Sequence, residues 1–131
     1  MDSSVRNAFD ERLESVLADL PEWIHGLLAE VPLHVEDYPP RDVLQQFGMN
    51  HRDQLCGLYT GVPLSDRSVA QGWRLPDAVT IYREGILGLA DDGRGNVSLG
   101  ELERQIRITV LHELGHHHGL EEDDLTKLGY G

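Results

Sequence analysis

Hydrophobic residues recur at helical spacing through the first 30 residues, and a proline divides them into two groups. The first group consists of Phe9, Leu13, Val16, Leu17 and Leu20. Pro21 follows, and proline is well tolerated in the first turn of a helix. Asp19 and Glu22 resemble a capping box for a second helix. We therefore expect two helices over residues 4–30, the second with a buried face formed by Trp23, Ile24, Leu27 and Leu28.

Three later segments have the composition of β-strands. Residues 31–36 alternate between apolar and polar side chains, and residues 55–60 and 78–83 are further strand candidates with glycine or proline near their ends. A short helix is expected over residues 42–47, after Pro39 and Pro40. The sequence therefore predicts a small sheet that follows the N-terminal helices.

The last long element is a helix from about residue 99 to residue 118. Ser98 is a suitable N-cap, and Gly119 is a natural stop. An apolar residue recurs at every fourth position, as Leu102, Ile106, Val110 and Leu114. We expect this stripe to be buried against the rest of the protein.

Length and charge restrict the class of protein. The chain has 131 residues, with 11 Lys and Arg against 23 Asp and Glu, which gives a formal net charge of −12. We expect one domain over residues 1–131 and no nucleic-acid partner, because binding to phosphates depends on cations. We also expect no membrane segment and a cytoplasmic location, since the N-terminus lacks the apolar core of a signal peptide. Cys56, the single cysteine, is expected to be a small buried strand residue.

The C-terminal helix carries a pattern with chemical meaning, His112-Glu113-Leu114-Gly115-His116. Two histidines four residues apart lie one helical turn apart on one face, so both imidazoles can reach one Zn²⁺ ion. Glu113 can hold a water molecule at such a site and accept its proton. On a helical projection Glu113 also falls within the apolar stripe, where a carboxylate is costly to bury. A general base at a partly desolvated site explains this placement.

A third metal ligand is expected shortly after the helix. Gly119 can adopt a positive φ and let the chain turn back toward the metal, which brings the carboxylate of Glu122 within reach. Asp123 is a competing ligand, and water or another residue is a further alternative. His117 is either a supporting residue or an exposed neighbour of the motif, and His117 and Tyr130 are candidates for stabilising an oxyanion.

The sequence with this motif resembles the minimal zincins, a family of small bacterial metallopeptidase-like proteins. Besides the motif, residues 57–67, 75–83 and 105–111 are similar to that family, so the resemblance covers most of residues 5–130. It implies an α+β zincin scaffold, in which a small three-stranded mixed sheet packs on the active-site helix beside the N-terminal helices. It also implies that His112 and His116 bind zinc and that Glu113 is catalytic. The family usually has Asp where this chain has Glu122.

Two functions from different classes follow from these observations. The first is a zinc-dependent hydrolase, most readily a peptidase acting on a peptide or protein substrate, with residues 55–60 as the antiparallel strand that borders the cleft. The second is a non-catalytic module that contains zinc and binds a peptide or protein. A metal-free acidic interaction domain is a third interpretation, and it has to treat the whole motif as accidental. The acidic charge favours basic peptides in each case.

Overall fold

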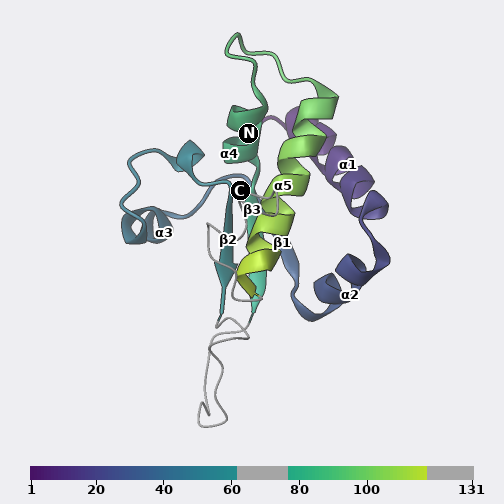
Figure 1. The fold of residues 1–131 in the computed structure, drawn as a ribbon. Helices are drawn as coiled ribbons and strands as arrows, with labels where there is room; N and C mark the ends of the chain where they lie inside the picture. The colour runs from purple at the N-terminus through teal and green to yellow at the C-terminus, as the bar shows by residue number, and fades with distance from the viewer. Residues whose placement is uncertain (62–76, 118–131) are drawn as a thin grey trace.

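A computed structural model describes residues 1–61 and 77–117, and all structural statements below concern that part of the chain. Its helices and strands form a mixed α+β fold around a three-stranded sheet, as the sequence predicted (Figure 1). The elements in chain order are α1 Ser3–Asp19, α2 Glu22–Glu30, β1 Leu33–Glu36, α3 Arg41–Gln46, the 3-10 helix η1 Arg52–Gln54, β2 Gly57–Thr60, β3 Ala78–Tyr82, α4 Arg83–Ala90 and α5 Leu99–His117.

The two N-terminal helices confirm the predicted break at Pro21, but the capping box was wrong. Asp19 is the last residue of α1, and Pro21 itself is the N-cap of α2, with no side-chain hydrogen bond. Helix α2 then ends at Glu30, and the N–H of its C-cap, Val31, donates to Leu27 O. Because that amide still belongs to the helix end, β1 starts two residues later than the sequence predicted.

The sheet has the order β1-β3-β2, which places β3 in the centre. Strand β1 is parallel to β3, with Leu33 opposite Val79. Strand β2 is antiparallel to β3, with Gly57 opposite Ile81. Strand β2 is therefore an edge strand, and its side away from β3 has no neighbouring strand within the described residues.

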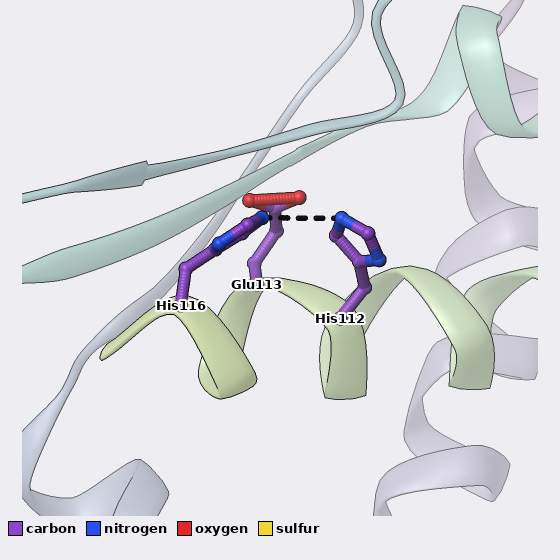
Figure 2. A group of neighbouring side chains, drawn as sticks. All are labelled: His112, Glu113 and His116. Carbon is purple, nitrogen blue, oxygen red and sulfur yellow. Dashed lines mark hydrogen bonds between the residues drawn. The ribbon is translucent and has the colours of Figure 1, made fainter. Parts of the chain in front are cut away.

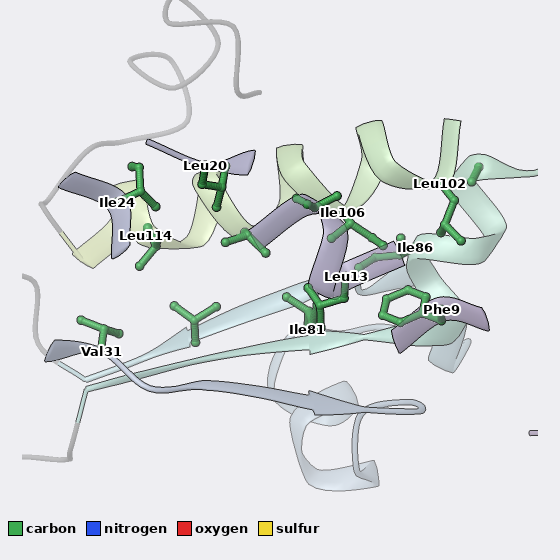
Figure 3. Close-up of a cluster of buried hydrophobic side chains, with 14 residues drawn as sticks. Phe9, Leu13, Leu20, Ile24, Val31, Ile81, Ile86, Leu102, Ile106 and Leu114 are labelled. Atoms are coloured by element: carbon green, nitrogen blue, oxygen red, sulfur yellow. The ribbon is translucent and has the colours of Figure 1, made fainter. Parts of the chain in front are cut away.

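Helix α5 crosses one face of the sheet, and α1 lies alongside it (Figure 1). Its apolar stripe is buried, as predicted, with Ile106 and Val110 fully inaccessible. Figure 3 shows these side chains meeting those of β3 and α1 in one core. The core consists of Phe9, Leu13, Val16, Leu20, Ile24, Val31, Val79, Ile81, Ile86, Ala90, Leu102, Ile106, Val110 and Leu114.

A buried arginine joins α1 to the end of the sheet. Arg83 donates to both carboxylate oxygens of Asp10 at 3.0 Å and to Asp37 Oδ1 at 2.8 Å. Arg6 binds the other oxygen of Asp37 at 2.6 Å. These four side chains form a continuous network of ion pairs. The network connects the end of β1 and the start of α4 to α1.

Helix α4 was not predicted from the sequence. It begins directly after β3 without an intervening loop, so Arg83, expected as the last strand residue, is its first residue. Gly85 lies against the backbone of Leu55, where a β-carbon would be 2.9 Å from the carbonyl carbon. No described helix is long and apolar enough to cross a membrane.

Candidate metal centre

The orientation of α5 is fixed by its cap and by its buried stripe. Ser98 Oγ accepts a hydrogen bond from the N–H of Glu101 at 3.1 Å, which confirms Ser98 as the N-cap. Burial of Leu102, Ile106 and Val110 then fixes the rotation of the helix about its axis. The same rotation directs Glu113 toward the sheet, because residue 113 follows residues 102, 106 and 110 on one face.

The two motif histidines point their Nε2 atoms at each other. These atoms are 3.2 Å apart, and the ring planes of His112 and His116 are inclined by 79° (Figure 2). Two nitrogens bound to one tetrahedral zinc ion lie about 3.3 Å apart, given Zn–N distances of about 2.0–2.1 Å. The pair therefore has the spacing that a shared zinc ion requires.

Glu113 completes a cluster of three potential metal-binding side chains. Figure 2 shows its carboxylate beside the imidazoles of His112 and His116, and the ligand atoms of the three all lie within 4.8 Å of one another. The residue is 9% exposed, whereas both histidines are half-buried. The expected placement of this carboxylate at the buried side of the helix is thus what the structure shows.

Strand β2 passes directly over this cluster. A β-carbon on Gly57 would lie 2.9 Å from Thr109 Cγ2 and 3.0 Å from Glu113 Cγ. Only glycine allows the strand to approach the helix so closely. Sequence reasoning missed this contribution of Gly57 and Thr109, although a glycine within a strand is a known sign of close backbone approach.

Cys56 lies just before β2 and is half-buried, close to the expectation of a buried strand residue. Burial raises the pKa of its thiol to about 11, and the negative charge of Glu113 adds to the shift. The thiol therefore stays protonated at neutral pH, which makes it a weak nucleophile and a weak metal ligand.

Several predicted site residues lie outside the described part of the chain. These are Glu122, Asp123 and Tyr130, together with the side chain of His117, whose backbone ends α5. The third metal ligand and the oxyanion-stabilising group stay predictions from the sequence.

The donor set suits zinc. Imidazole nitrogens and carboxylate oxygens are both common zinc ligands, and in catalytic sites three protein ligands leave a coordination position for water or substrate. Two histidines and one further carboxylate would form such a set. Glu113, adjacent to His112 in sequence and buried beside the pair, would then be left to hold a water molecule and accept its proton.

Comparison with known proteins agrees with this chemistry. The family model for zincin-like metallopeptidases matches residues 28–131, which include the sheet, α5 and the motif. No curated protein matches the chain. The matched region covers most of the sequence. The chain therefore belongs to the zincin-like metallopeptidase family.

Proposed function

We propose that this protein is a zinc-dependent peptidase in which Glu113 acts as the general base. His112 and His116 would hold the metal, with Glu122 as the third ligand and Asp123 as its alternative. Zinc bound there would supply Lewis-acid polarisation of the scissile carbonyl and make a water molecule more acidic. The observation that carries the proposal is the approach of the two Nε2 atoms to 3.2 Å directly beside the buried carboxylate of Glu113.

In the proposed reaction Glu113 takes part in two successive proton transfers. Its carboxylate orients the attacking water and accepts a proton from it as the new C–O bond forms. It then passes that proton to the leaving nitrogen as the C–N bond breaks, so that one water molecule is consumed and an acid and an amine are released. Low exposure favours this exchange, because few solvent molecules compete for the proton.

The free side of β2, which has no neighbouring strand within residues 1–61 and 77–117, supports a peptide as substrate. Strand β2 is an edge strand, and its first residue, Gly57, lies against Glu113. An extended peptide can add to such an edge through backbone hydrogen bonds. A peptide bound there would lie next to the general base.

We also propose that the protein is located in the cytoplasm.

The test is Glu113→Gln, which keeps the size of the side chain and removes its basicity. We expect the variant to bind as much zinc as the wild type while its cleavage of a mixed peptide library falls by about 100-fold or more. Unchanged cleavage by the variant would overturn the role of Glu113. If the zinc-loaded wild type binds peptides and cleaves none, the non-catalytic peptide-binding module replaces the peptidase.

A further inference from the structure

A second feature lies beside the candidate centre, on the N-terminal side of β2. It is a cavity of about 490 Å³ bordered by the turn before η1, by η1 itself and by the end of α4. We refer to it as the η1 cavity. Its lining residues are Gly48, Met49, Asn50, Asp53, Gln54, Cys56 and Leu89.

The η1 cavity is close to Glu113, the proposed general base, because consecutive residues of the chain contact each of them. Cys56 forms part of its wall, and the next residue, Gly57, is the one that packs against Glu113. Neighbouring residues of an extended chain are about 3.4 Å apart along the strand. A peptide lying along β2 with its cleaved bond at Glu113 can therefore place a nearby side chain in this cavity.

The lining combines apolar walls with one acidic group. Met49, Cys56 and Leu89 supply the apolar surface, and Leu89 is 59% exposed although it is a large hydrophobic residue. Gln54 is already engaged, because its Oε1 accepts from the N–H groups of Asn50 and His51. Asp53 is the charged residue of the lining, and Asn50 adds a neutral side-chain amide.

Asp53 is not neutralised by the cation beside it in sequence. Arg52 points elsewhere, with Nε 2.8 Å from Glu84 and its guanidinium 4.0 Å from the centre of the Tyr38 ring. Within the described residues we find no ion pair or hydrogen bond of the Asp53 carboxylate. An exposed anion at the rim of an apolar cavity matches a side chain with an aliphatic stem and a cationic end.

Building on the peptidase function above, we propose that the η1 cavity is a specificity site for a lysine or arginine side chain of the substrate, held near the cleaved bond. The stem would lie along Met49 and Leu89, and the cation would reach Asp53. The net charge of −12 would favour the same substrates before contact, because it attracts basic peptides.

The test measures binding, so that it does not depend on turnover. Three amidated pentapeptides are compared on the zinc-loaded Glu113→Gln protein by calorimetry. Each has two alanines on either side of a central lysine, norleucine or glutamate. Norleucine keeps the apolar stem of lysine and removes its charge, which separates the two contributions.

Two substitutions of Asp53 and one control complete the experiment. We expect the lysine peptide to bind about three- to fivefold more tightly than the norleucine peptide, because an exposed ion pair raises affinity by at most about fivefold. Asp53→Asn should remove that preference, and Asp53→Lys should reverse it toward glutamate. Glu14→Gln, the same change of charge at an exposed position of α1, should retain it.

Equal affinity for lysine and norleucine, or a preference that survives Asp53→Asn, would overturn the proposal. The result is separate from the test of the peptidase function. A lysine preference that depends on Asp53 supports the η1 cavity even if the wild type cleaves nothing. If cleavage does not depend on Asp53, the peptidase function is unaffected, and the η1 cavity does not contribute to substrate specificity.

Discussion

Gly57 and Glu113 approach each other so closely that a β-carbon on residue 57 would lie 3.0 Å from Cγ of Glu113. Gly57 starts β2, an edge strand of the sheet, and Glu113 is the expected general base on α5. The absence of a side chain at residue 57 thus determines how near a substrate on β2 can come to the base. This contact joins the fold of the sheet to the proposed chemistry.

Substituting Gly57→Ala should impair catalysis while zinc binding is retained. The added methyl would press on Thr109 Cγ2 at 2.9 Å and on Glu113, shifting β2 or the carboxylate. We expect kcat/KM to fall by about 10- to 100-fold, because a misplacement of about 1 Å can cost about 100-fold in rate. The measurement is peptide cleavage together with zinc content per chain.

Two further variants make that experiment specific. Thr109→Ser keeps the hydroxyl that donates to Gln105 O and removes the methyl, so adding it to Gly57→Ala should restore part of the lost activity. Gly100→Ala, at an open position in the first turn of α5, should leave activity unchanged. Full activity in Gly57→Ala would show that the close approach has no catalytic role.

Gly85 and Gly88 provide a matched pair for the packing of α4. Gly85→Ala should destabilise the protein by about 1–3 kcal/mol, because its β-carbon would meet the backbone of Leu55 and Cys56. Gly88→Ala has open space around it and should stabilise the helix by about 0.5–1 kcal/mol. Urea unfolding of both variants measures the difference. Equal effects at the two positions would contradict the close packing of α4 on residues 55 and 56.

The carboxylate of Asp37 should make the stability of the protein depend on acidic pH. Hydrogen bonds from Arg6, and then from Arg83, lower its pKa from 3.8 to about 2. A lowered pKa in the folded state stabilises the protein above the unfolded value of about 4, and this contribution is lost as the pH falls toward about 2. We expect the free energy of unfolding to decrease over that interval.

Asp37→Asn should remove much of that pH dependence and lower stability near neutral pH by about 1–3 kcal/mol. Glu14→Gln, at an exposed position, is the control. Urea unfolding at pH 2.5, 4 and 7 compares the three proteins. An identical dependence on pH in Asp37→Asn and the wild type would mean that the network around Arg83 does not couple protonation to folding.

Removal of the metal should abolish cleavage and leave the fold intact. The hydrophobic core is built without His112, Glu113 or His116, so the metal-free protein should unfold cooperatively. If only the folded state binds zinc, a free zinc concentration of 100 times the Kd raises the free energy of unfolding by about 2.7 kcal/mol. Added zinc should therefore raise the Tm. His116→Ala should show no such rise. An unfolded metal-free protein would instead indicate a structural zinc site.

The sequence predicted the elements whose signals are local. Ser98 and the four-residue repeat of apolar positions defined α5, and the same projection anticipated that Glu113 would be buried. Alternation and the flanking glycines and prolines located both ends of each of the three strands to within two residues. In each case the residues that make the prediction possible lie within one element. Their hydrophobic periodicity indicates which face of that element is buried.

Features that depend on tertiary contacts could not be predicted in the same way. Helix α4 contains Gly85 and Gly88, which have low helix propensity, and it is stabilised by packing on residues 55 and 56 and by burial of Ile86. The placement of β3 between β1 and β2 depends on pairing between distant segments. The contact of Gly57 with Glu113 follows from that order, since it requires β2 beside α5.

One zinc ion bound through the histidines of the motif is the basis of the proposed chemistry. The most direct measurement is the zinc content per chain, by mass spectrometry of untagged protein prepared without a chelator, beside His112→Ala. We expect close to one zinc per wild-type chain and a loss of zinc in the variant. Wild-type protein that holds no zinc, even after zinc is added, would contradict this expectation.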